Sequence, residues 1–107
     1  MDDHRAWRIS IHEGGHAVCS RLVGLPSGCA LVGETQAYAR FRREWSAACV
    51  AALMAGVAAE IVVFGGYDST GCKTDMEHAE MRLVALGYDD DGSAELWRWT
   101  LDASMRM

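Results

Sequence analysis

One long apolar segment, SAACVAALMAGVAAEIVVFGG at residues 46–66, constrains the fold more than any other part of the chain. A run of about 20 apolar residues is long enough to cross a bilayer as a helix. This run is rich in Ala and Gly and carries Glu60, and an ionisable side chain is costly inside a membrane. The segment therefore predicts a buried core helix, and no membrane span is expected in this chain.

Helical spacing over residues 43–64 puts one charged residue, Glu60, on a stripe that is otherwise apolar or small. The other members of the stripe are Trp45, Cys49, Leu53, Gly56 and Val63. A buried carboxylate has to be paired, hydrogen-bonded or protonated. We therefore expect a partner for Glu60, such as a histidine that is bound to a metal.

A first helix is predicted over residues 5–23, because Gly24 and Pro26 follow it as stop signals. Apolar spacing assigns its core face to Trp7, Ile11, Gly14, Val18 and Leu22. Two adjacent glycines in a helix, Gly14 and Gly15, each cost about 1 kcal/mol relative to Ala. Such a pair indicates that another segment, most naturally the core helix, passes close to this backbone.

The rest of the chain predicts a mainly α fold of about four helices in one domain, residues 1–107. Strand-like segments at 30–32 and 37–41 predict a short β-hairpin between the first two helices, with its turn at 33–36. Residues 65–73 are expected to form a loop. A third helix should cover 75–86, and Ser93 should cap a final helix.

The first helix carries the motif H-E-x-x-H, with His12 and His16 one turn apart and Glu13 after the first histidine. Histidines four apart on a helix can direct two ring nitrogens at one point, which suits zinc at about 2.0–2.1 Å from each. In that arrangement Glu13 acts as the general base that takes a proton from the activated water. The alternative is a surface helix with two solvated histidines.

Two histidines do not complete a catalytic zinc site, which usually has three protein ligands and an open position. Asp75 follows a flexible segment and can be carried toward the first helix, whereas His4 lies on that helix itself. The candidates for the third ligand are Asp75, His78, Cys72, Glu60, Asp68 and His4. The residues alone leave this choice open.

Charge and cysteine content exclude some classes of function. The net charge is −5, with 15 acidic against 10 basic residues and no basic run, so no nucleic-acid partner is expected. The first residues, MDDHRAW, do not resemble a secretory leader, which favours a cytoplasmic location with reduced thiols. The four cysteines form no C-x-x-C pair, and among them only Cys72 is considered as an extra ligand.

Three segments resemble, in the same order, signatures of the peptidase domain of FtsH-type ATP-dependent zinc metalloproteases. They are HEGGHAV, MAGVAAEIVVFGG and STGCKTDMEHAEMRLV, and the resemblance covers roughly residues 5–88. It implies a compact zincin-like helical domain that binds Zn²⁺ and hydrolyses peptides or unfolded protein segments.

Carried over residue by residue, the resemblance makes His12, His16 and Asp75 the zinc ligands and Glu13 the general base. It gives Glu60 a supporting role near the zinc. His78 then becomes an ordinary exposed or packed helix residue.

The chain also departs from the family. It contains no G-x-x-x-x-G-K-[ST] motif, so ATP dependence is not carried over. Residues 18–43 form a shorter region than the family has between its first two motifs, which leaves the substrate cleft undefined. A separate ATPase partner or a homo-oligomer remains open. So does the alternative function of a zinc-binding module, or partner subunit, without useful turnover.

Overall fold

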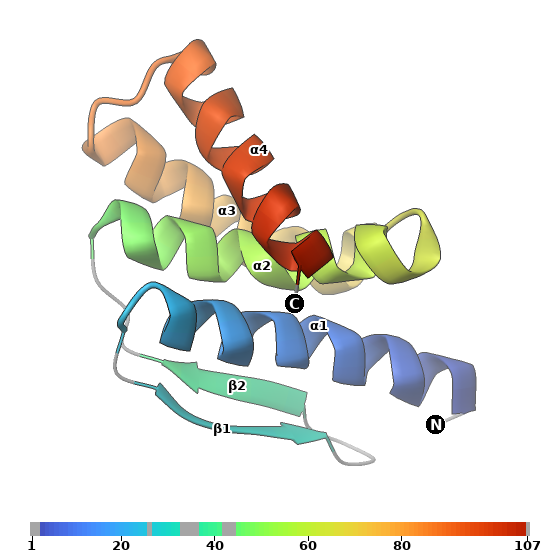
Figure 1. The fold of residues 1–107 in the computed structure, drawn as a ribbon. Coiled ribbons are helices and arrows are strands. Elements are labelled where there is room, and N and C mark those ends of the chain that lie inside the picture. The colour runs from blue at the N-terminus through green and yellow to red at the C-terminus, as the bar shows by residue number, and fades with distance from the viewer. Residues whose placement is uncertain (1–2, 26, 33–36, 42–44, 107) are drawn as a thin grey trace.

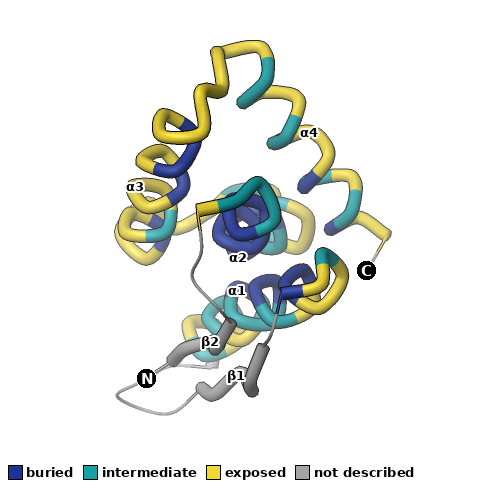
Figure 2. The backbone as a smooth tube through the Cα atoms, turned by 90° about the vertical axis from the view of Figure 1, so that its left-hand side faces the viewer, coloured by how far each residue is buried: buried dark blue, intermediate teal, exposed yellow. Residues whose placement is uncertain are grey.

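The computed structural model describes the backbone of residues 3–25, 27–32, 37–41 and 45–106, and the side chains of residues 4–25 and 45–106. Helix α2 lies at the centre, with α1 on one side and α3 and α4 on the other (Figures 1 and 2). The elements in chain order are α1 (Asp3–Leu22), β1 (Ser27–Val32), β2 (Ala37–Phe41), α2 (Ala47–Phe64), α3 (Ser69–Ala85) and α4 (Asp90–Arg106).

The predicted core helix is confirmed as α2. Its first turn is capped by Ser46, whose hydroxyl accepts the Cys49 N–H at 3.2 Å, and it ends at Gly65 with a left-handed φ of 77°. Among the described residues, α2 is the one helix whose length and apolar composition would allow it to cross a membrane. Buried core helices meet the same criteria, and α1, α3 and α4 all pack against this one. The structure therefore gives no clear membrane span.

The predicted core face of α1 is wrong. Trp7, Val18 and Leu22 are exposed, and the buried positions of this helix are His12, Gly15, His16, Cys19 and Ser20. The backbones of α1 and α2 approach closely, which explains why the opposite face of α1 is buried. A Cβ on Gly15 would lie only 2.5 Å from the Ala55 carbonyl oxygen. The side of α1 that carries the histidines is thus the side that packs on α2.

Alanine substitutions at the two adjacent glycines of α1 should change the stability in opposite directions. A Cβ at Gly15 would overlap α2, whereas one at Gly14 would meet nothing within 4 Å. Gly15→Ala should therefore lower the free energy of unfolding by about 1–3 kcal/mol through overpacking. Gly14→Ala should raise it by up to about 1 kcal/mol through helix propensity. Urea denaturation of the two variants measures both values, and equal effects would contradict this packing of α1 on α2.

The two strands pair antiparallel, with Leu31 opposite Tyr38 and Val32 opposite Ala37. They lie against α1 on the side away from α2 (Figure 1). The first strand begins at Ser27, three residues earlier than expected, and the predicted turn at 33–36 lies outside the described residues.

The expected fold class, a compact zincin-like helical domain of about four helices with a short β-hairpin between the first two, needs correction. Apart from Leu25, every buried side chain among the described residues belongs to one of the four helices. The core is thus built by helices packed around α2.

Helices α3 and α4 both begin earlier than the sequence indicated. The predicted loop at 65–73 is helical from Ser69, because Asp68 caps α3 by accepting the Thr70 N–H at 3.1 Å. The final helix begins at Asp90 instead of after Ser93, and Asp89 accepts the Gly92 N–H at 2.7 Å. The early start of α3 places Cys72 and Asp75 one turn apart on a single helix, facing α1.

Candidate metal centre

His12 and His16 from α1 and Asp75 from α3 bring three ligand atoms together. The two Nε2 atoms of the histidines are 3.0 Å apart. Asp75 Oδ2 lies 2.9 Å from His12 Nε2 and 2.8 Å from His16 Nε2. The histidines are buried and Asp75 is partly buried, so the three atoms form a compact group with limited access to water.

The outer nitrogen of each histidine ring is already committed as a donor. His12 Nδ1 lies 2.6 Å from Glu60 Oε2, and His16 Nδ1 lies 2.7 Å from the backbone carbonyl of Ala52. A carboxylate and a carbonyl only accept, so both Nδ1 atoms carry the proton and both neutral rings present a lone pair at Nε2. These two lone pairs and a carboxylate oxygen face one another and repel unless a proton or a metal cation lies between them.

The charges around this group favour a cation. Burial lowers the pKa of His12, but its hydrogen bonds to Asp75 and Glu60 outweigh burial and raise that pKa from 6.5 to about 8. Burial raises the pKa of Asp75, but hydrogen bonds from the two histidines reverse this and hold it well below its ordinary value. Asp75 is thus ionised at neutral pH, and without metal His12 is the group that takes up a proton.

These shifts predict how the stability of the metal-free protein depends on pH. Because the folded-state pKa of His12 is raised from 6.5 to about 8, its contribution of about 2 kcal/mol is present below pH 6.5 and lost as pH rises through 8. The depressed pKa values of Asp75 and Glu60 contribute stability above about pH 4 that is lost in acid. Stability without metal should peak between these limits.

Urea unfolding from pH 4 to 9 in a chelator checks this pH dependence. With excess zinc the peak should move above pH 8, because metal competes with the proton at His12. An unfolding free energy that is flat from pH 6 to 9 in the chelator would contradict the assigned role of His12.

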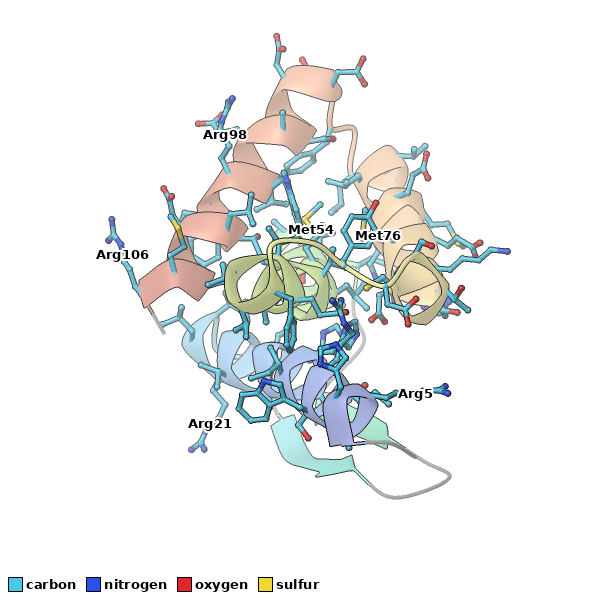
Figure 3. The ribbon with its side chains drawn as sticks, turned by 90° about the vertical axis from the view of Figure 1, so that its right-hand side faces the viewer. Arg5, Arg21, Met54, Met76, Arg98 and Arg106 are labelled. Atoms are coloured by element: carbon cyan, nitrogen blue, oxygen red, sulfur yellow. The ribbon has the colours of Figure 1, made fainter. Side chains whose placement is uncertain are left out.

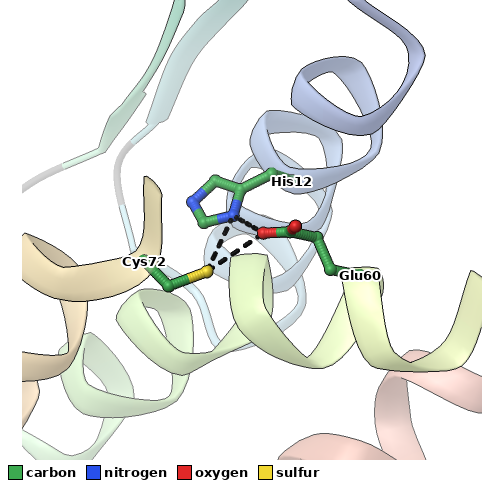
Figure 4. Close-up of side chains that lie close together, drawn as sticks. All are labelled: His12, Glu60 and Cys72. Atoms are coloured by element: carbon green, nitrogen blue, oxygen red, sulfur yellow. Dashed lines mark hydrogen bonds and ion pairs between the residues drawn. The ribbon is translucent and has the colours of Figure 1, made fainter. Parts of the chain in front are cut away.

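Glu60 has the partner that its burial requires. Only 2% of its surface is exposed, and His12 Nδ1 and the Cys72 thiol, at 3.0 Å, donate to its Oε2 (Figure 4). Arg8 Nη1 at 2.7 Å and the Asp68 N–H at 3.2 Å donate to its Oε1. Burial would raise the pKa of Glu60, but these donors lower it. Glu60 is therefore a carboxylate that fixes the orientation of the His12 ring.

Cys72 belongs to a second group that could hold a metal, formed with His12 Nδ1 and Glu60. This group fits a metal less well. Burial, and then the neighbouring Glu60 carboxylate, raise the pKa of the Cys72 thiol far above its ordinary value, so it stays protonated and acts as a donor. Both Glu60 oxygens already accept hydrogen bonds. Cys72 also lies on the Nδ1 side of the His12 ring, 3.7 Å from that nitrogen, so it does not complete the first group.

Glu13 lines a pocket of about 170 Å³ that His12 also lines. The pocket is lined by Arg5, Arg8, Ile9, His12, Glu13, Glu60, Asp68 and Gly71. It lies next to the His12 ring, so a small group bound there has His12 and Glu13 on its walls. Neither His16 nor Asp75 lines this pocket, so of the three converging residues it borders His12 alone.

Sequence reasoning missed two residues that shape this centre. A Cβ at Gly56 would lie 2.6 Å from His16 Nε2 and 2.7 Å from His12 Nε2, so only glycine leaves room for both rings. Arg8 forms an ion pair with the Glu60 carboxylate, and its guanidinium carbon lies 4.6 Å from the centre of the Phe64 ring. Arg8 lies one turn before His12 on α1, and this spacing was the available signal.

The remaining candidate ligands lie elsewhere. His78 is exposed on α3, and His4 packs edge-on against Phe64 with ring centroids 5.8 Å apart. Asp68 is exposed and caps α3. Of the six candidates for a third ligand, Asp75 is the one whose oxygen meets both Nε2 atoms.

No known protein family and no curated protein matches the chain.

Proposed function

We propose that this protein is a zinc metallopeptidase that hydrolyses peptide bonds in peptides or unfolded segments. His12 Nε2, His16 Nε2 and Asp75 Oδ2 hold the zinc. One observation carries the proposal: these three atoms converge within 3.0 Å of one another while both outer ring nitrogens are already donating. A buried group of lone pairs arranged in this way is stabilised by a positive charge between them, which a proton on His12 or a bound metal ion supplies.

The donor set fits zinc in type and in size. Two imidazole nitrogens and one carboxylate oxygen leave a fourth, open position, as in catalytic zinc sites. Ligands about 2.05 Å from a tetrahedral ion lie about 3.3 Å from one another. The separations of 2.8–3.0 Å therefore need to widen by only a few tenths of an ångström.

Bound zinc would supply a Lewis acid that lowers the pKa of water and polarises a carbonyl. Glu13 follows His12 on α1 and lines the same pocket, so its carboxylate would take the proton from the attacking water and pass it to the leaving amine. Glu60 and the Ala52 carbonyl keep both histidines in the tautomer that faces the metal. Arg8 keeps Glu60 ionised through their ion pair.

The peptide substrate rests on the resemblance of three ordered motifs to FtsH-type peptidases, together with the H-E-x-x-H chemistry. On the same resemblance we propose unfolded protein as the substrate class and the cytoplasm as the location. A separate ATPase that delivers the substrate is a compatible partner.

A zinc-binding module without turnover is the second candidate. The small volume of the pocket, about 170 Å³, favours it, because such a pocket admits little more than one side chain. The open coordination position favours the enzyme, since structural zinc sites usually have four protein ligands. A turnover assay separates the two.

The first assay is hydrolysis of unfolded casein by the purified protein. Activity should be lost in a chelator and restored by stoichiometric zinc, because the zinc ion is what lowers the activation free energy of hydrolysis. The control is zinc with casein alone. A protein that carries one zinc per chain yet cleaves neither casein nor a broad peptide library would favour the binding module.

A further inference from the structure

A second pocket lies on the opposite side of α1 from the metal centre. It is an open pocket lined by residues of α1, α2 and α4, with a volume of about 230 Å³. Its lining residues are Ser10, Ile11, Gly14, Gly15, Val18, Ala59, Val62, Val63 and Ser104, none of them charged. Gly14 is two residues after His12 and therefore points about 160° away from it around the helix. This pocket contributes nothing to the chemistry proposed above.

Two features of this pocket have no explanation within one chain. Ser104 is only 9% exposed, and its hydroxyl is the one buried side-chain oxygen or nitrogen among the described residues without a hydrogen-bond partner. A buried hydroxyl without a partner is costly. Gly14 has open space where a Cβ would lie, so packing inside the chain does not require a glycine there.

Trp7 lies on the same face of α1, two turns before Gly14. Its side chain is 55% exposed although apolar spacing marks this face as a core face. If two α1 helices pack antiparallel about a two-fold axis between Ser10 and Ile11, each Trp7 lies opposite the Gly14 of the other helix. A two-fold interface has this reciprocity, in which residue i meets j and j meets i.

We propose that this face binds a second copy of the chain, with the partner's Trp7 filling the pocket at Gly14. A cavity of about 150 Å³ is enough to bind benzene, so 230 Å³ accommodates an indole ring. The indole N–H is a donor only, and a buried one needs an acceptor. The Ser104 hydroxyl provides that acceptor, which accounts for both unexplained features with one contact.

The charge distribution agrees with a copy of the same chain as the occupant. Each chain carries a net charge of −5, so contact between two copies is opposed least at a face that brings no like charges together. The pocket lining has none. Another pocket, of about 390 Å³, is lined by Leu22, Trp99, Asp102, Ala103 and Arg106, with one charge of each sign. Arg106 and Arg21 both point outward from the molecule (Figure 3).

Sedimentation equilibrium of the full chain over about 1–200 μM tests the proposal. The wild type should form a dimer whose Kd rises at least about 30-fold in Trp7→Ala, as expected for a central aromatic anchor. Gly14→Leu should raise it similarly by filling the pocket. The matched control is Trp45→Ala, because Trp45 is equally exposed, at 55%, but lies just before α2 and packs against Arg82. It should leave the Kd unchanged.

A second measurement keeps the proposal testable if a variant is unstable. In Ser10→Cys the new thiols lie beside the proposed two-fold axis, so mild oxidation should link two chains through a disulfide. The wild type and Glu80→Cys, which places the new thiol on α3, should not be linked in this way. Far-UV circular dichroism monitors folding. A wild type that stays monomeric, or a dimer that survives both Trp7→Ala and Gly14→Leu, would overturn the proposal. So would a monomer that binds phosphatidylcholine vesicles through Trp7.

Discussion

Glu13→Gln is expected to abolish peptide hydrolysis while leaving zinc in the protein. The glutamine has the same shape but cannot accept a proton, and loss of a general base costs about 10²–10⁴-fold in rate. Glu13 is not among the three atoms that converge, so metal binding does not depend on it. Casein hydrolysis and the zinc content of the same sample measure the two effects together.

The control for this variant is Glu80→Gln, which makes the same chemical change at an exposed position on α3. It should retain both zinc and activity. Full activity in Glu13→Gln would contradict the role of Glu13 as the base. Loss of zinc from that variant would instead contradict the ligand set, because it would make Glu13 part of the metal site.

Asp75→Ala is expected to weaken zinc binding by more than about 100-fold, since changes to residues that only orient ligands already cost 10–100-fold. The substitution removes the one oxygen ligand of the proposed set and leaves only the Nε2 atoms of the two histidines. Titration of the metal-free protein against a zinc-buffered chelator measures the affinity. Asp75 is partly exposed on a capped helix, so the variant should fold, which circular dichroism verifies.

His78→Ala is the matched control for Asp75→Ala, because His78 lies one turn further along α3 and is the competing ligand in the sequence. It is exposed and should bind zinc as the wild type does. A larger loss of affinity in His78→Ala than in Asp75→Ala would refute the choice of the third ligand.

The sequence predicted the parts of the fold that depend on local signals. The end of α2 at Phe64 follows from two glycines, and the end of α1 follows from Gly24 and Pro26. The starts of α3 and α4 were missed because Asp68 and Asp89 were not recognised as caps. Both aspartates accept a backbone N–H, so this signal was present in the sequence.

The face of α1 was mispredicted for a tertiary reason. Hydrophobic periodicity favoured Trp7 and Val18 as core residues. The carboxylates that bind His12 lie on α2 and α3, so the face of α1 that carries His12 is the one that packs on them. The site was predictable where spacing is local, as for His12 and His16. The hydrogen bond from Arg8 to Glu60 joins residues 52 positions apart, so helical spacing could place Arg8 beside His12 but could not identify Glu60 as its partner.

Anomalous X-ray diffraction at the zinc edge, on crystals of protein purified without chelator, tests the metal centre most directly. One strong peak is predicted about 2.0–2.2 Å from His12 Nε2, His16 Nε2 and Asp75 Oδ2. A peak between His12 Nδ1, Glu60 and Cys72 would contradict the ligand assignment. Crystals grown with excess zinc that show no peak at either group would contradict the zinc site itself.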